Sequence, residues 1–264
     1  MIVDGKQIAA RIYREVTDVT AAFTRPPVLV ALTCAPNFET EKYLHLKRKK
    51  AAEVGVALEV VELPEDSTTE VVVAMIQKVA EYADGIVVQL PFPPTIDREI
   101  ILAAVPSEKD PDGFSYGRVA AAQLPPVVGA IAEIAKDNNI SFKDAHVVVM
   151  GQGRLVGAPA AEFLRREGAF VTTLTEADKH NLEVLRDADI IVSGIGQPHF
   201  VTVDMVKPGV VIFDAGTSED GGVVVGDVHP DVASIARLYT PVPGGIGPIT
   251  IALLLRNLVN LVRQ

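Results

Sequence analysis

Apolar residues follow two patterns in turn along the first third of the chain, helical spacing and short continuous runs. Helices are predicted over residues 6–22, 41–54 and 68–82, and strands at 28–32, 58–63 and 85–90. Pro26 and Pro27 separate the first helix from the first strand, and Gly55 is placed to cap the second helix. Strands that alternate with helices predict an α/β fold with a parallel sheet and right-handed crossovers.

A second alternating unit begins near Leu124. Helices are predicted over 128–138, 160–166 and 181–186, and strands at 146–150, 170–174, 189–192 and 210–213. The strand at 146–150 leads into Gly151-Gln-Gly153-Arg-Leu-Val-Gly157 and then into a helix. A glycine motif between a strand and a helix indicates dinucleotide binding, because the backbone can approach the pyrophosphate at the helix N-terminus. The alternative is a structural turn.

The segment 239–250 has three prolines and three glycines in twelve residues and is followed by the apolar run 251–255. Proline removes backbone donors and glycine costs backbone entropy, so this composition does not suit the interior of a strand or helix. It predicts a tight loop that opens a helix, with amides available to an anionic or polar ligand. An ordinary turn is the alternative.

Composition narrows the classes of protein. The chain has 264 residues and a net charge of −10, which argues against a general nucleic-acid surface. Its single cysteine, Cys34, excludes an internal disulfide and a thiolate metal cluster. No charged-then-apolar leader and no run of about 18 apolar residues occurs. We therefore expect a soluble cytoplasmic protein that contacts neither nucleic acid nor membrane.

Polar residues in the first unit stand where ligands bind in open α/β sheets. Tyr43 and Lys47 are four residues apart on a predicted helix and share a face, although a solvated basic face is the alternative. Gln89 ends a predicted strand, where it could instead cap the strand. Asp110 and Asp112 lie in a turn and are either turn formers or acceptors for a donor-rich heterocycle.

Glu176 bears on the choice of cofactor. It stands 19 residues after Gly157 (176 − 157), about where a carboxylate binds the adenine ribose hydroxyls of NAD and repels the extra phosphate of NADP. The alternative is a solvated loop charge beside Asp178. Arg154 and Lys179 could still give a phosphate a cationic partner.

Six segments carry more information together than each does alone. They are Tyr43-x-x-x-Lys47, Gly85-Ile-Val-Val-Gln-Leu-Pro91, Lys109-Asp-Pro-Asp-Gly-Phe114, Val156-Gly-x-Pro159, Gly226-Asp-Val228 and Thr240-Pro-Val-Pro-Gly-Gly-Ile-Gly-Pro248. In this order they resemble the bifunctional methylenetetrahydrofolate dehydrogenase/cyclohydrolase family. The resemblance implies a folate-binding catalytic domain over 1–120, completed by a C-terminal helix over 245–264, and a Rossmann NAD(P)-binding domain inserted over 121–244. It also implies a homodimer that acts in one-carbon metabolism and supplies purine biosynthesis.

The resemblance also assigns roles to residues, with no metal ion. Lys47, Tyr43, Gln89 and Asp112 match the family's catalytic residues, Lys47 as the proton-shuttling group and Asp112 as the acceptor for the pterin N–H groups. Further folate contacts are expected at Thr40, Leu90, Pro91, Pro243, Gly244, Gly245 and Pro248. Cofactor contacts are expected at Gly151, Gln152, Gly153, Arg154, Val156, Gly157, Glu176 and Thr217.

The sequence departs from the family pattern mainly in the cofactor half. The family's Pro-Cys-Thr-Pro is Leu124-Pro-Pro-Val127 here, and its Gly-Arg-Ser is Gly151-Gln-Gly153, which lacks the arginine that commonly meets the NADP phosphate. Its His-Ser-Arg-Thr is Thr175-Glu-Ala-Asp178, and the segment between Phe114 and Gly117 is shortened. We expect retained folate chemistry with cofactor choice shifted toward NAD. The alternatives are a cyclohydrolase with weak or lost dehydrogenase and a non-catalytic folate- or nucleotide-binding relative.

Overall fold

The computed structural model describes residues 1–178 and 181–263, and the chain divides into two compact units. We name each unit after the number of strands in its main sheet. The three-stranded unit comprises Ala10–Pro125 and Ile251–Gln264, and the five-stranded unit comprises Met1–Ala9 and Pro126–Thr250. Helices α1 (Gly5–Thr20) and α8 (Ile246–Val262) contribute residues to both units.

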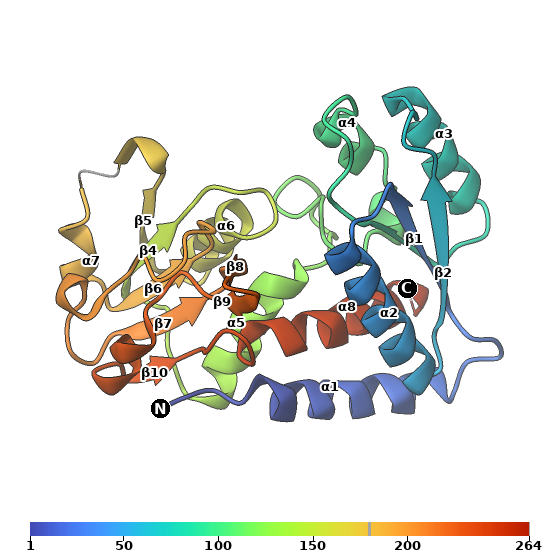
Figure 1. Ribbon diagram of the computed structural model, residues 1–264. Coiled ribbons are helices and arrows are strands. Elements are labelled where there is room, and N and C mark those ends of the chain that lie inside the picture. The colour runs from blue at the N-terminus through green and yellow to red at the C-terminus, as the bar shows by residue number, and fades with distance from the viewer. Residues whose placement is uncertain (179–180, 264) are drawn as a thin grey trace. The chain divides into compact units, whose positions relative to one another are not determined.

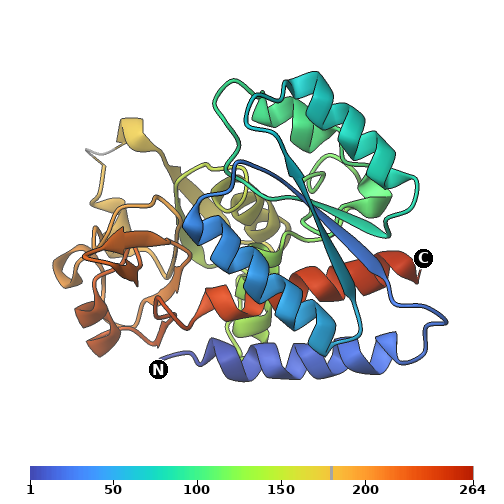
Figure 2. The ribbon, with the colours of Figure 1, turned by 45° about the vertical axis from the view of Figure 1, so that its right-hand side comes forward.

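The three-stranded unit is built on a parallel sheet with the order β2-β1-β3, as the alternating pattern predicts. Its strands are β1 (Val28–Cys34), β2 (Ala57–Leu63) and β3 (Gly85–Val88), and its helices include α2 (Phe38–Glu53), α3 (Thr69–Ala80) and α4 (Arg98–Ala103). Val30 and Leu32 of β1 share one core with α3 and α4, while α2 packs along β2 (Figures 1 and 2). Helix α2 begins three residues earlier than predicted, because Asn37 Oδ1 caps it by accepting a hydrogen bond from the Thr40 amide at 2.9 Å.

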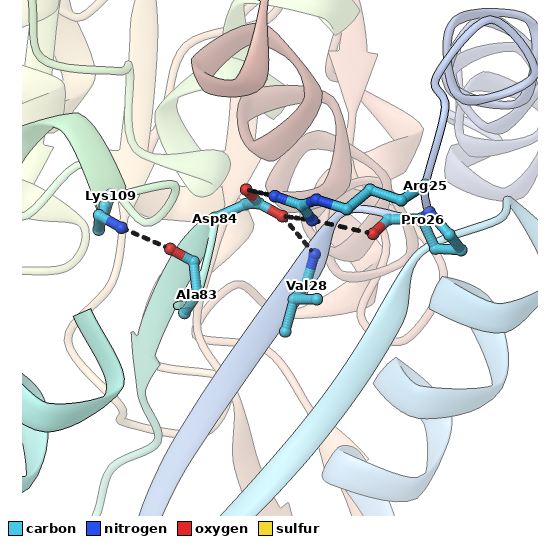
Figure 3. A network of polar contacts seen from close by, with 6 residues as sticks. All are labelled: Arg25, Pro26, Val28, Ala83, Asp84 and Lys109. Atoms are coloured by element: carbon cyan, nitrogen blue, oxygen red, sulfur yellow. Dashed lines mark hydrogen bonds and ion pairs between the residues drawn. The ribbon is translucent and has the colours of Figure 1, made fainter. Parts of the chain in front are cut away.

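A polar cluster ties the beginnings of β1 and β3 together (Figure 3). Asp84, directly before β3, accepts two hydrogen bonds from the Arg25 guanidinium, at 2.6 and 2.8 Å, and one from the Val28 amide at 2.7 Å. Lys109 Nζ donates to the Ala83 carbonyl at 2.6 Å. The cluster lies at the amino ends of these strands, opposite the edge where ligands bind in parallel sheets.

Replacing Asp84 with alanine is expected to lower the free energy of unfolding at neutral pH by about 1–3 kcal/mol, because the Val28 amide loses its acceptor. Burial raises the pKa of Asp84, but the hydrogen bonds from Arg25 and Val28 outweigh burial and hold the pKa below its ordinary value. The stabilisation is therefore present above the unfolded-state pKa of about 4 and is lost as the pH falls further. Urea unfolding at neutral and acid pH measures this, with exposed Asp66→Ala as the control. An equal loss of stability in both variants would show that the hydrogen bonds of Asp84 do not contribute the predicted stabilisation.

The five-stranded unit has a parallel sheet with the order β10-β7-β6-β4-β5. Its strands are β4 (His146–Met150), β5 (Phe170–Leu174), β6 (Ile190–Ser193), β7 (Val211–Asp214) and β10 (Leu238–Tyr239), and its helices include α5 (Pro126–Asp137), α6 (Gly157–Arg166) and α7 (Val184–Asp187). Leu185 of α7 packs in one core with alternate strand residues such as Ile191, while α6 packs on β4, β5 and β6 (Figure 1). The strand order reverses between β4 and β6, which is the topological switch point of this sheet.

Several elements differ from the sequence predictions. An antiparallel hairpin of β8 (Ser218–Asp220) and β9 (Val223–Val225) was not expected, and neither was the two-residue strand β10. Helix α6 begins at Gly157 rather than 160, and the helix expected over 181–186 is the single turn α7. Short 3-10 turns occupy Ser107–Lys109, Glu176–Asp178, Val203–Met205 and Pro230–Ser234.

The proline- and glycine-rich segment forms a short loop and then the start of α8. The helix begins at Ile246, so Gly247 and Pro248 lie in its first turn, where a missing proline N–H costs nothing. The Val242–Pro243 peptide bond is cis. Within the described residues, no helix is both long and apolar enough to span a bilayer.

Candidate active site

A buried lysine, Lys47, is paired with the half-buried Gln89 at the carboxyl edge of the three-stranded sheet. Lys47 is 7% exposed, and its Nζ donates to Gln89 Oε1 at 2.9 Å. The other end of the Gln89 amide donates to the Leu90 carbonyl at 3.1 Å, which turns its oxygen toward the lysine. The same Nζ lies 4.7 Å from the centroid of the Tyr43 ring, one helical turn away. Lys47 is therefore not part of a solvated face, unlike its exposed neighbour Lys49.

Two carboxylates stand in the turn after the 3-10 segment Ser107–Lys109, and they differ in role. Asp110 is 1% exposed, and its Oδ2 accepts a hydrogen bond from the Ser115 amide at 2.9 Å, so it acts as a turn former. Asp112 is half-buried. Burial raises the pKa of Asp112 to about 6, the positive charge of Lys47 opposes this rise, and the charge of Asp110 adds to it. Lys47 and Asp112 thus lie close enough to interact electrostatically.

Asn257 of α8 is hydrogen-bonded to this turn, and it was not predicted from the sequence. Its Nδ2 donates to the carbonyls of Pro111 and Leu124, both at 2.9 Å, and the residue is 7% exposed. The signal that could have found it is an amide side chain between the apolar residues Leu255 and Leu258 of the C-terminal helix, since buried polar groups require partners.

The remaining predicted folate contacts fall in both units. Thr40, 5% exposed, lies on α2 one turn before Tyr43, and Leu90 and Pro91 follow β3 and are joined by a cis peptide bond. Pro243, Gly244 and Gly245 belong to the five-stranded unit, as does Pro248. There the Gly5 amide donates to the Gly244 carbonyl at 2.9 Å, and a Cβ on Gly5 would lie 1.8 Å from the Gly245 oxygen, so only glycine fits at position 5.

A cavity of about 280 Å³ opens at the carboxyl ends of β4, β5 and β6, at the switch point of the five-stranded sheet. It is lined by Met150, Gly151, Gly153, Leu174, Thr175, Glu176, Asp178, Leu182, Gly194, Ile195, Gln197 and Phe200. The predicted contacts Gln152, Arg154, Val156, Gly157 and Thr217 are not among these lining residues.

The three glycines of the loop serve different purposes. Gly151 has a φ of +88°, which favours glycine, and a Cβ on Gly157 would lie 2.0 Å from the Gly151 carbonyl oxygen. A Cβ on Gly153 would meet nothing within 4 Å. Backbone conformation and packing therefore explain why glycine is required at positions 151 and 157. Gly153 has no such constraint, and the open space beside it in the cavity suits a phosphate group of a ligand. The loop thus suits a dinucleotide.

Two acidic side chains, Glu176 and Asp178, line the cavity. Asp178 Oδ2 accepts hydrogen bonds from the Thr175 amide at 2.8 Å and from Thr175 Oγ1 at 2.7 Å, which fixes the turn after β5. Glu176 is exposed in this turn and lines the cavity. Arg154 lies half-buried in the glycine loop, and Lys179 is outside the described residues. No group of three His, Cys, Asp or Glu side chains suited to a metal ion occurs in the described part of the chain.

Two further buried acids beside the cavity were also missed. Asp214 ends β7, and Asp227 lies in the segment Gly226-Asp-Val228; both are fully buried. Burial raises the pKa of Asp214 to about 6, against three backbone N–H groups that lower it, and the charge of Asp227 adds to the rise. Buried carboxylates are costly unless their oxygens are hydrogen-bonded, so we expect the hydrogen bonds of these two acids to be needed for the structure of the unit.

These features define a class of protein: a two-unit α/β protein with a nucleotide cavity at a sheet switch point and a separate, buried lysine site. Comparison with known proteins gives the family. Residues 3–112 match the catalytic domain of tetrahydrofolate dehydrogenase/cyclohydrolase, and residues 125–264 match its NAD(P)-binding domain. The chain belongs to the tetrahydrofolate dehydrogenase/cyclohydrolase family.

Relatives resemble the chain over its whole length. It is 36% identical to the bifunctional protein FolD of Methanospirillum hungatei, over 100% of this chain and 98% of that protein. The FolD crystal structure from Campylobacter jejuni superposes with a TM-score of 0.95 at 31% identity, over 100% and 98% of the two chains. A Trypanosoma brucei FolD, solved with NADP and an inhibitor, gives a TM-score of 0.92 at 33% identity, over 100% and 97%. The two-domain α/β fold expected from the sequence is therefore confirmed.

Proposed function

We propose that this chain oxidises methylene-tetrahydrofolate to methenyl-tetrahydrofolate with a nicotinamide dinucleotide and hydrolyses that product to formyl-tetrahydrofolate. Membership of the family and full-length similarity to proteins named bifunctional support both activities. The observation that carries the proposal is the buried Lys47 and its hydrogen bond to Gln89, because a pure binding protein has no need of a buried base.

The oxidation requires alignment rather than proton transfer. A nicotinamide dinucleotide held beside the loop Gly151–Gly157 would supply the acceptor for the hydride of the bridging carbon, and loss of that hydride would leave the folate as a resonance-stabilised methenyl cation. The protein has to hold two rings in register, so positioning accounts for most of its contribution. We assign that task on the folate side to Tyr43 and Asp112. On the dinucleotide side, the loop Gly151–Gly157 and the cavity beside it would hold the cofactor.

The hydrolysis requires a proton acceptor. Water adds to the methenyl carbon and releases one proton, which leaves a hydroxyl group on that carbon. The hydroxyl then loses its proton to become the formyl C=O as the C–N bond to one ring nitrogen breaks, and that nitrogen takes up a proton. We assign the proton transfers to the Lys47 amine, which must be neutral when it receives a proton. Gln89 accepts one N–H of this amine at 2.9 Å and so fixes the orientation of the amine.

Purified protein tests both activities. Methylene-tetrahydrofolate is supplied with NAD or NADP, and the reduced cofactor and the methenyl product are followed together. Reduction of a dinucleotide followed by loss of the methenyl absorbance is the expected result. Hydrolysis of added methenyl-tetrahydrofolate without reduction of either dinucleotide would instead identify a cyclohydrolase that has lost its dehydrogenase, an alternative favoured by the departures at Gly151–Gly153. The absence of both reactions would reject the proposal.

We further propose that NAD is the preferred dinucleotide. Glu176 and Asp178 both line the cavity after β5, where the adenine ribose lies in this fold. A carboxylate there accepts hydrogen bonds from the ribose hydroxyls and repels a phosphate. The family arginine of the glycine loop is replaced by Gln152, whose side chain donates to the Gly151 carbonyl at 2.8 Å.

The expected result is a kcat/KM for NAD at least about tenfold above that for NADP, since a like-charge contact of this kind is worth on the order of 1–3 kcal/mol. Glu176→Gln should raise kcat/KM for NADP and narrow the ratio. Glu167→Gln, an exposed acid at the end of α6, is the matched control and should leave the ratio unchanged. A preference for NADP in the wild-type protein would reject the role of Glu176 and point to Arg154 or Lys179.

The remaining assignments are also proposals. We infer functional domains over 1–120 with 245–264 and over 121–244, and a homodimer, which sedimentation of the purified protein tests. A cytoplasmic location is proposed from the single cysteine, Cys34, which is buried and free in the structure. Fractionation of cells that express the tagged chain tests the location.

A further inference from the structure

The carboxylate of Asp227 is fully buried and accepts three hydrogen bonds at the carboxyl end of β6. Ser193 Oγ and the Ile195 amide donate to Oδ2, both at 2.8 Å, and the Gln197 amide donates to Oδ1 at 2.9 Å. Both oxygens are used, and two of the three donors are backbone groups. The carboxylate therefore fixes the path of the chain over residues 195–197.

The segment that Asp227 holds is a wall of the cavity. Gly194, Ile195 and Gln197 line the cavity directly, across the switch point from the glycine loop after β4. A Cβ on Gly194 would lie 2.9 Å from Cγ1 of Val156, so the segment also packs closely against the residue that opens α6. Displacement of residues 195–197 would change the shape of the cavity without altering the sheet.

Asp214 holds Asp227 in turn. Its carboxylate accepts hydrogen bonds from the amides of Gly216, Asp227 and Val228 at 2.9, 3.1 and 2.9 Å. The glycines make room for both acids: a Cβ on Gly216 would lie 2.3 Å from Asp227 Oδ1, and a Cβ on Gly226 would lie 2.1 Å from Asp214 Oδ2. Hydrogen bonds therefore connect Asp214, at the end of β7, to Asp227, and connect Asp227 to the cavity wall.

We propose that Asp227 is a positioning residue for the dinucleotide, which fixes the backbone of residues 195–197 as the preformed wall against which the cofactor binds. The inference rests on the function proposed above, in which this cavity holds the dinucleotide. Asp227 itself does not line the cavity, so it acts through Ile195 and Gln197 rather than by touching the cofactor. Preformed walls favour binding because no ordering of the loop is then required.

Asp227→Asn is the discriminating variant, because it keeps the shape of the side chain and removes one acceptor. Whichever way the amide is turned, its NH₂ group faces the Ile195 or the Gln197 amide, and a backbone N–H cannot rotate away as the Ser193 hydroxyl can. We expect the Kd for the preferred dinucleotide to rise by about tenfold or more, as the loss of one hydrogen bond to a charged acceptor implies.

The experiment compares three variants with the wild-type protein. Calorimetric titration with NAD and with NADP gives the Kd, and steady-state kinetics give KM for the dinucleotide and kcat. Hydrolysis of methenyl-tetrahydrofolate without dinucleotide checks folding independently. Asp227→Asn is tested beside Gly216→Ala, whose new methyl group displaces the Asp227 carboxylate, and beside Asp220→Asn, an exposed acid of the same unit as the control.

The expected pattern is a raised Kd and KM in Asp227→Asn and Gly216→Ala, with cyclohydrolase activity retained and Asp220→Asn unchanged. If Asp227→Asn does not fold, Gly216→Ala decides in the same way. If the folded Asp227→Asn variant binds the dinucleotide with the Kd of the wild-type protein, the positioning role is overturned and the proposed function is left intact. The same holds for Gly216→Ala if Asp227→Asn does not fold. Failure of the wild-type protein to bind either dinucleotide would overturn both.

Discussion

Replacing Lys47 with methionine is expected to lower cyclohydrolase kcat by about 10²–10⁴-fold, the usual contribution of a positioned acid–base group. Methionine keeps most of the length and the apolar stem, so packing beside Tyr43 is conserved while the amine is lost. Dehydrogenase activity should fall much less, because hydride transfer requires alignment and no proton acceptor. The two activities are measured separately, with methenyl-tetrahydrofolate and with methylene-tetrahydrofolate plus dinucleotide.

The matched control is Lys49→Met, which removes the same charge from an exposed position on the same helix. It should leave both activities unchanged. An equal loss of both activities in Lys47→Met would show that Lys47 serves only to bind the folate. Full cyclohydrolase activity in Lys47→Met would reject its assignment as the proton-transfer group.

The second large effect is expected at Asp112. Its pKa is raised to about 6, chiefly by burial, so the carboxylate is ionised at neutral pH and becomes protonated as the pH falls through this value. Only the ionised form accepts hydrogen bonds from two pterin N–H groups. The kcat/KM for the folate should therefore fall below about pH 6, by up to tenfold for each pH unit, because kcat/KM reports the groups of the free enzyme.

Asp112→Asn should remove this pH dependence and lower kcat/KM at neutral pH by about 10²-fold, since one charge-assisted acceptor is replaced by a donor. Asp18→Asn, an exposed acid on α1, is the control and should keep the wild-type profile. A wild-type kcat/KM that stays level through pH 6, or an Asp112→Asn variant with wild-type activity, would contradict the role of Asp112. The profile is measured with saturating dinucleotide and limiting folate.

The sequence by itself determined the elements and the class of fold. Continuous apolar runs such as Val28–Cys34 form strands with buried faces on both sides, and amphipathic segments such as α3 cover them, so the local pattern is enough to predict parallel sheets. The loop Gly151–Gly157 could likewise be read locally, since its backbone demands exclude most side chains. The strands of the hairpin β8–β9 have three residues each, which is too short to show a hydrophobic period, and they were not predicted.

Only the tertiary structure decided which polar residues form sites. On composition alone, Lys47 belongs to a basic helix surface, and it becomes a buried base because Gln89, 42 residues later, meets its amine. Asp110 and Asp112 look alike in the turn, but the Ser115 amide pairs with the first, whereas burial near Lys47 raises the pKa of the second. All three donors to the Asp227 carboxylate lie at least 30 residues away along the chain. Hydrophobic periodicity is a local property, whereas burial and pairing of polar groups depend on distant segments that only folding brings together.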